Sequence, residues 1–159
     1  MEEQIMNMPA VALRGLTILP GMIAHFDISR ERSLRAVEEA MEQDQKIYLV
    51  TQRNVDSEDP TQEDLYQMGI VADIKQVVRL QNDVVRILVD GISRAALLGF
   101  TGNEKYLEAE ICYCDSNADS LPEDLREAML LGVREAFHRY AAVVGKISKE
   151  LIRQIDQYD

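Results

Sequence analysis

The sequence predicts an α+β fold, in which a partly closed β-barrel lobe with one main helix is followed by a small helical lobe. Short runs rich in β-branched and aromatic residues, separated by turn residues, recur through residues 1–115. About seven such strands with a single early helix are typical of a sheet that closes on itself. In residues 116–159 the apolar side chains recur at helical spacing instead. A chain of 159 residues is long enough to bury a core.

The first strands and the main helix are expected early in the chain. Residues 9–14 and 22–28 are predicted to be strands, the second because its side chains divide between two faces. Ser29 can cap a helix of about 14 residues. The core-facing stripe of this helix would consist of Leu34, Val37 and Met41. Residues 46–52 follow as a buried strand, because they are rich in branched and aromatic side chains.

Hairpin signals dominate the second half of the barrel. Thr61 and Asp64 form a capping arrangement for one short helical turn. Residues 69–80 and 84–91 are predicted to pair as strands across a short polar turn. Residues 93–100 would then continue the sheet.

The last predicted strand, residues 106–114, alternates between two faces. One face carries Leu107, Ala109, Ile111 and Tyr113, and the other carries Glu108, Glu110, Cys112 and Cys114. Two thiols on one face allow two interpretations, a redox switch or two reduced thiols, and cysteine usage favours reduced thiols. A zinc site needs about four ligands, and the sequence offers no second cysteine pair.

A polar break at residues 115–120 precedes the helical lobe. A capping box beginning at Ser120 starts a long helix, which Gly145 can stop in a left-handed cap. One side of this helix carries Leu125, Met129, Val133, Phe137, Tyr140 and Val144. Ser148 begins a last helix whose apolar stripe has few partners, so we expect the lobe to be truncated and to continue in a longer protein.

The composition argues against several classes of function. The formal net charge is −11, and the Lys and Arg residues form no cluster. Nucleic acids and anionic membranes are bound through clustered basic residues, so both are disfavoured as partners. No stretch approaches the ~20 apolar residues that span a bilayer, and the acidic N-terminus does not match a signal peptide. We therefore expect a cytoplasmic protein.

No catalytic, cofactor-binding or metal-ligating set emerges from the sequence. Gly145-Lys146 lacks both the upstream glycine and the following Ser or Thr of a phosphate-binding loop. His25 and His138 have no nucleophile close to them in sequence. Adjacent carboxylates such as Glu38-Glu39 lie in polar surroundings, which do not raise a pKa for acid–base catalysis. The chain is therefore predicted not to be an enzyme by itself.

An ordered series of residues resembles a known family. The series is Pro9, Leu13, Arg14, Pro20, Arg30, Ser33, Gly69, Gly91, Arg94 and Ala95. In this order and spacing the chain resembles the N-terminal domain of ATP-dependent Lon proteases, well over residues 8–115 and more loosely over 120–159. It departs from the family pattern at Ala12, where proline is usual, and at Gly15, where aspartate is common. The resemblance implies a PUA-like β pseudobarrel followed by a helical lobe.

The resemblance also implies a function. This part would recognise and hold the substrates of an ATP-dependent serine protease, with no catalysis of its own. The implied partners are unfolded or damaged proteins and other copies of the full-length protein in a ring-shaped homo-oligomer. ATP and Mg²⁺ would belong to an ATPase module outside this chain, so no cofactor is expected here. Two alternatives are a free-standing LON-domain substrate receptor and a PUA-like RNA-binding module, which the acidic charge disfavours.

Seven apolar residues are candidates for the surface that contacts substrates. They are Leu16, Ile18, Leu19, Pro20, Met22, Tyr66 and Met68. The first five lie in the connection between the first two strands, which is unusually apolar for a loop. Misfolded proteins expose apolar segments, and an exposed apolar patch suits their binding. The alternative, which stays open from the sequence, is that the connection folds inward and plugs an open end of the barrel.

Overall fold

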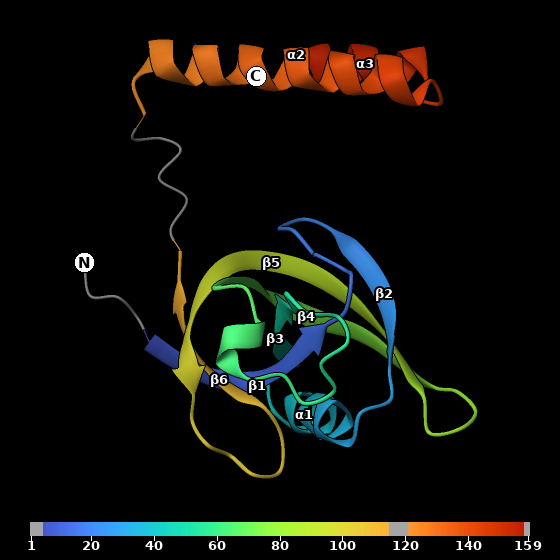
Figure 1. Ribbon diagram of the computed structural model, residues 1–159, viewed down its shortest axis with the longest axis vertical. Helices are drawn as coiled ribbons and strands as arrows, with labels where there is room; N and C mark the ends of the chain where they lie inside the picture. The colour runs from blue at the N-terminus through green and yellow to red at the C-terminus, as the bar shows by residue number, and fades with distance from the viewer. Residues whose placement is uncertain (1–4, 115–120, 158–159) are drawn as a thin grey trace. The chain divides into compact units, whose positions relative to one another are not determined.

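The computed structural model describes residues 5–114 and 121–157. These residues belong to two compact units, Met1–Asp115 and Ser116–Asp159, called here the β-rich unit and the helical unit. Figure 1 shows a strongly curved sheet in the first unit and a pair of helices in the second. The predicted α+β fold is confirmed.

The described part of the β-rich unit contains a six-stranded sheet. Its strands are β1 (Ile5–Leu13), β2 (Ile23–Ile28), β3 (Lys46–Thr51), β4 (Met68–Arg79), β5 (Val85–Phe100) and β6 (Glu108–Tyr113). The strand order is β2-β5-β4-β3-β1-β6, and β6 pairs with β5 as well, which closes the sheet into a barrel. β1 and β3 pair in parallel, whereas the other pairs are antiparallel. β2 pairs with β5 alone and therefore ends the sheet with one free edge.

β5 is one long strand where the sequence predicts two. Its first half pairs with β2 and its second half with β6, while β4 runs along both halves. The register against β4 shifts at Gly91–Ser93, so Ile92 is the extra residue of a bulge. A bulge bends a strand and strengthens its twist. This bend allows a single strand to serve both ends of the barrel.

The main helix, α1 (Glu31–Glu42), is capped differently from the prediction. Its N-cap residue is Arg30 rather than Ser29, and no side chain caps it. The buried face consists of Ser33, Ala36, Val37 and Ala40. Met41, predicted to face the core, is 39% exposed, so this part of the prediction is wrong. The buried face is instead formed around small residues such as Ala36 and Ala40, which let the helix approach the sheet closely. Val37 is the one member of the predicted stripe that is fully buried.

β1 divides its side chains between two cores, as expected from the alternation of a strand. Val11 and Leu13 join the larger core, which includes the buried face of α1. Ala10 and Ala12 face the second core on the opposite side of the strand, around Tyr48. The end of β1 therefore lies against the α1 side of the barrel, where one of the surfaces described below is found.

Tyr48 is a fully buried polar side chain whose hydroxyl is satisfied. It donates a hydrogen bond to the carbonyl oxygen of Ala95 at 3.1 Å, and burial raises the pKa of this hydroxyl. Its ring passes over Gly69, where a Cβ would lie 2.5 Å from the Tyr48 Cζ and 2.6 Å from the carbonyl oxygen of Leu49. Glycine is therefore required at position 69 because a side chain has no room there.

The smaller elements follow the sequence closely. The predicted short turn is the 3₁₀ helix η1 (Gln62–Asp64), with the capping box of Thr61 and Asp64 present. In the helical unit, α2 (Glu123–Val144) ends at Gly145, which adopts the predicted left-handed conformation at φ 65°. α3 (Lys149–Asp156) begins after Ser148, whose hydroxyl accepts a hydrogen bond from the Leu151 amide at 3.2 Å. The predicted capping residue Ser120 lies outside the described residues.

α2 has little of its apolar side buried within the helical unit. Ala141 is its buried residue, and Phe137 is half-buried one turn earlier. His138 and Asp156 join the two helices through a contact of 2.8 Å between Nε2 and Oδ1. The predicted stripe is largely exposed within this unit, at Leu125, Met129, Val133, Tyr140 and Val144. No helix among the described residues is long and apolar enough to cross a bilayer.

Candidate substrate-binding surfaces

The apolar connection between β1 and β2 is divided between the core and the surface. Ile18 is 5% exposed and belongs to the larger core, and Leu16 is partly buried against the same core. These two residues therefore follow the inward-facing alternative that the sequence left open, and they do not form an exposed surface. Leu19, in contrast, is 59% exposed, and Pro20 and Met22 are exposed as well.

A pair of backbone hydrogen bonds holds the exposed end of this connection against β5. The Gly21 amide donates to the Gly91 carbonyl at 2.7 Å, and the Gly91 amide donates to the Met22 carbonyl at 2.9 Å. The approach is so close that a Cβ at Gly91 would overlap the carbonyl oxygen of Leu19. The connection is therefore a fixed part of the barrel wall.

The fixed connection brings together four exposed apolar side chains, which we call the loop-end patch. They are Leu19, Met22, Ile23 and Ile92. Ile23 is 68% exposed and Ile92 is 46% exposed. Neither residue was among the predicted contact residues, although Ile23 shares a predicted strand face with the polar His25 and Asp27, which indicates exposure. Ile92 is exposed because it is the extra residue of the bulge in β5, and no local pattern of side chains predicts that bulge.

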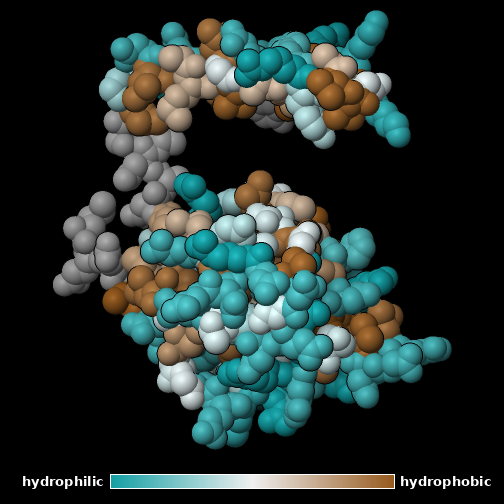
Figure 2. Space-filling view, viewed as in Figure 1, coloured by the Kyte–Doolittle hydropathy of each residue, from teal (hydrophilic) through white to brown (hydrophobic). Residues whose placement is uncertain are grey.

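Tyr66 and Met68 lie on a second exposed area, which we call the tyrosine depression. Their exposed fractions are 49% and 46%. The depression has a volume of about 420 Å³ and is lined by Thr17, Thr51, Arg53, Tyr66, Gln67 and Met68. The Arg53 guanidinium stacks 5.0 Å from the centre of the Tyr66 ring. Thr17, which lies between the candidates Leu16 and Ile18 in sequence, lines the depression together with Tyr66 and Met68. Figure 2 shows apolar residues of the β-rich unit in small groups between hydrophilic ones.

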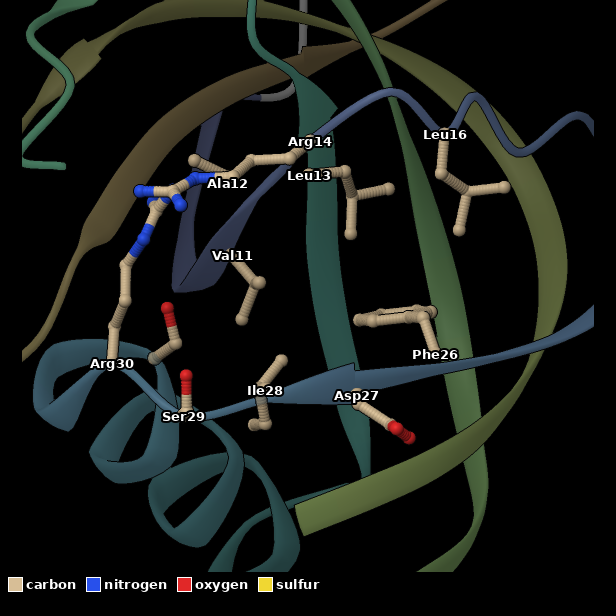
Figure 3. A pocket seen from close by; sticks show the side chains of 11 residues that line it. Val11, Ala12, Leu13, Arg14, Leu16, Phe26, Asp27, Ile28, Ser29 and Arg30 are labelled. Atoms are coloured by element: carbon tan, nitrogen blue, oxygen red, sulfur yellow. The ribbon is translucent and has the colours of Figure 1, made fainter. Parts of the chain in front are cut away.

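A third feature is a hollow between the end of β1, β2 and the start of α1, which we call the β1–α1 pocket (Figure 3). Its volume is about 230 Å³. Its apolar wall is formed by Val11, Leu13, Leu16, Phe26 and Ile28. Arg14, Arg30 and Ser29 stand on the opposite side, and the two guanidinium groups lie next to each other. The pocket therefore combines an apolar cavity with a cationic rim.

The cationic rim is held by the polar segment after β3. Arg30 Nη2 donates to Gln52 Oε1 at 2.6 Å, and the Arg14 Nη2 donates to the carbonyl oxygen of Ser57 at 3.1 Å. Gln52 is 2% exposed and its amide nitrogen donates to the same Ser57 carbonyl at 3.0 Å. Burial, and then the Arg14 charge, lower the pKa of Arg30, whereas Glu58 acts in the opposite direction.

The remaining candidates for chemistry stay apart. No group of His, Cys, Asp and Glu suited to a metal ion occurs among residues 5–114 and 121–157. Cys112 is buried, although it shares a predicted strand face with Glu108 and Glu110. It is buried because β1 and β5 flank it on both sides. Cys114 Sγ lies 3.7 Å from Met68 Sδ.

The barrel and its following helices have the fold of known protease N-terminal domains. The N-terminal domain of Lon protease from Mycobacterium avium complex superimposes with a TM-score of 0.72 at 16% identity, covering 96% of this chain and 76% of that one. The Lon N-terminal domain protein from Xanthomonas campestris gives a TM-score of 0.58 at 17% identity, covering 97% and 91%. These similarities establish the fold class.

The sequence establishes the family. The model of the ATP-dependent protease La (LON) substrate-binding domain matches residues 7–159, and the chain belongs to this family. It is 38% identical to a Lon protease of Lachnoclostridium phytofermentans over 98% of this chain. It is 32% identical to Lon protease 1 of Bacillus subtilis over 94% of this chain. The chain spans 19% of the length of each of these relatives, so it corresponds to their substrate-binding part, and the predicted resemblance is confirmed.

Proposed function

We propose that this domain captures unfolded or damaged proteins through the loop-end patch, with the tyrosine depression as a second contact. The single observation that carries the proposal is that Leu19 and Ile23 are more than half exposed on a backbone fixed to Gly91. A fixed apolar surface loses little conformational entropy when a client binds. Its contacts are shallow and carry no side-chain hydrogen bond, which suits clients of varied sequence.

The apolar patch gains free energy from the surface that it removes from water. Burying an apolar side chain fully contributes about 1.5–3 kcal/mol, and side chains that start about half exposed contribute roughly half of that. Four such residues support a weak, reversible affinity of the kind that a receptor for many clients needs. Met22 adds adaptability, because an unbranched thioether side chain fits differently shaped partners.

The proposal extends to the longer protein that the relatives represent. In it, this domain would deliver clients to an ATP-dependent serine protease that degrades misfolded and regulatory proteins in the cytoplasm. ATP and Mg²⁺ would bind in the ATPase module, and none of the described residues is assigned to them. The formal charge of −11 supports protein clients over nucleic acids or anionic membranes. A free-standing substrate receptor would use the same patch.

Self-association is a second proposed activity, and the helical unit favours it. α2 leaves a large apolar surface exposed within its own unit, with Val143 at 87% and Val133 at 64%. Figure 2 shows brown, apolar residues along this unit. We propose that this surface contributes to the ring-shaped homo-oligomer. Sedimentation over a concentration range tests the idea, and Val133→Ser/Val143→Ser should shift the equilibrium toward monomer.

The capture proposal is tested with the double variant Leu19→Ser/Ile23→Ser and a reduced, carboxymethylated lactalbumin as the unfolded client. Removing two exposed contacts should weaken binding roughly tenfold, which corresponds to about 1.4 kcal/mol. The matched control is Val78→Ser/Leu80→Ser, which removes two side chains that are each 40% exposed on the hairpin between β4 and β5. Binding that falls equally in both variants, or in neither, would contradict the assignment of the patch.

A further inference from the structure

We propose that the β1–α1 pocket binds the C-terminal carboxylate of a polypeptide whose last side chain is apolar. This inference rests on the proposed function, since it names a class of substrate that the same domain would select. The loop-end patch accepts apolar segments anywhere in a client. The pocket adds recognition of a chain end, and it uses different residues from the patch.

The cationic rim offers unused hydrogen-bond donors. Each guanidinium has five N–H groups. Arg14 uses one of them on the Ser57 carbonyl, and Arg30 reaches Gln52 and, at 3.4 Å, the same Ser57 carbonyl. Across residues 5–114 and 121–157, no carboxylate lies within ion-pair distance of either guanidinium. Two adjacent cations repel each other, so an anion bound between them gains from both charges.

The acidic groups nearby are already engaged or lie outside the pocket. Asp27 lines the pocket, but its two carboxylate oxygens accept from Arg86 at 2.6 and 2.9 Å. Its side chain points away from the two arginines in Figure 3. Asp59 pairs with Arg32 at 3.3 Å in the adjoining hollow. Glu58 also lines that adjoining hollow and attenuates the positive charge on the rim without occupying the pocket.

The apolar wall has the size of one side chain. Figure 3 shows Leu13, Leu16 and Phe26 directed into the same space. An apolar cavity of about 150 Å³ is enough to bind benzene. The whole pocket, cationic rim included, has a volume of about 230 Å³, which is enough for a leucine side chain together with its carboxylate. Leu16 and Phe26 are only partly buried at the edge of the larger core, so a ligand there would complete their burial.

A chain end is the ligand that matches both halves of the pocket at once. Leu13, Arg14 and Arg30 line one pocket of about 230 Å³, so the apolar wall and the cationic rim lie within the reach of one residue. Only at a C-terminus do a carboxylate and an apolar side chain share one Cα. In an extended internal segment, neighbouring side chains point to opposite faces, so an acidic residue beside an apolar one would not place both groups in the pocket.

The test uses the fluorescein-labelled peptide SGSGAL as the probe, in a free-acid and a C-terminal amide form. The free acid should bind at least tenfold more tightly, because charge-assisted bonds to guanidinium are lost in the amide. The free acid of SGSGAG should also bind more weakly, since it leaves the apolar wall empty. N-acetyl-leucine is then used to displace the labelled free acid. If the natural ligand is a polypeptide chain end, the peptide should bind more tightly than N-acetyl-leucine, whereas equal affinities would indicate a site for small carboxylic acids.

Substitutions of the two arginines test whether the cationic rim binds the carboxylate. Arg14→Gln and Arg30→Gln should abolish the preference for the free acid, whereas Arg79→Gln, at a site 82% exposed near the end of β4, should retain it. Because Arg30→Gln also removes a bond to Gln52, amide shift mapping on the unmodified domain provides an independent readout. Shift changes on adding the free acid should centre on residues 11–16 and 26–33.

The outcomes separate this inference from the proposed function. Equal binding of acid and amide, or shift changes centred elsewhere, overturns the pocket assignment. If the pocket assignment fails but the Leu19→Ser/Ile23→Ser variant still has a lower affinity for the unfolded protein, the proposed function stands. A domain that prefers the free acid but does not bind the unfolded protein supports the pocket and overturns the proposed function.

Discussion

The close approach of the connection to β5 predicts that Gly91→Ala destabilises the β-rich unit severely. The new Cβ would overlap the Leu19 carbonyl oxygen and lie 2.8 Å from Ile70 Cδ1. The nearest atom belongs to the backbone, so a rotamer change cannot relieve the overlap. The connection must move away from β5, which strains or breaks the two hydrogen bonds to Gly91.

The size of the effect follows from these contacts. Overpacking a core costs about 1–3 kcal/mol, and each weakened hydrogen bond removes about 0.5–1.5 kcal/mol. Replacing glycine by alanine returns about 0.4–1 kcal/mol by restricting the unfolded chain. We expect a net loss of about 2–4 kcal/mol in the free energy of unfolding. The loop-end patch should lose client affinity in the same variant, because Leu19 and Met22 shift with the connection.

Gly99→Ala is the matched control in the same strand. There the nearest atom to the new Cβ is the flexible Gln62 Oε1 at 3.9 Å, so nothing has to move. This variant should be unchanged or slightly more stable. Urea unfolding followed by near-ultraviolet circular dichroism of the 6 tyrosines measures both, as the chain has no tryptophan. Equal stability of the two variants would refute the argument that contact at Gly91 fixes the connection.

Three further substitutions test other parts of the structure. Ile18→Ala should lower the free energy of unfolding by about 2–4 kcal/mol in urea titrations, because it leaves a cavity in the core that a surface residue would not. Tyr48→Phe should cost about 1–2 kcal/mol in the same titrations, since the buried Ala95 carbonyl loses its hydroxyl donor. The hydrogen bond from the Lys75 side chain holds the pKa of the Asp73 carboxyl below its usual range, so this carboxylate stabilises the fold at pH values above the pKa that it has in the unfolded chain. Asp73→Asn should therefore lose stability at pH 7, and the difference from the unmodified protein should vanish as the pH falls through the lowered pKa.

The strands were predictable where the side chains repeat with a period. β6 shows the expected burial at Ala109 and Ile111, because alternation fixes which side chains face the core. β3 is buried on both faces from Ile47 to Val50, as its branched and aromatic composition predicts. The long helix and its Gly145 stop were predictable for the same reason, together with local capping chemistry. The division between β-rich and helical segments followed from the change of period near residue 116.

The candidate surfaces were less predictable because loops have no period. Ile18 is buried and its neighbour Leu19 is exposed, and only the turn at Gly21, with φ 76°, and the bonds to Gly91 decide between them. The β1–α1 pocket depends on Arg14 and Arg30, which meet only after β2 has crossed between them. Both residues belong to the series that carries the family resemblance, yet nothing local to either one shows that their guanidinium groups converge.

The pairing of β1 with β6 has a consequence for synthesis on the ribosome. Ile5 pairs with Cys112 and Pro9 with Glu108, so the first strand meets its last partner only after about a hundred further residues have been made. At roughly 5–20 residues per second, this delay lasts about 5–20 s. During that interval one edge of β1 is an open template for other chains. The domain therefore begins folding with an unpaired strand edge, so prompt arrival of β6 is a condition for safe folding.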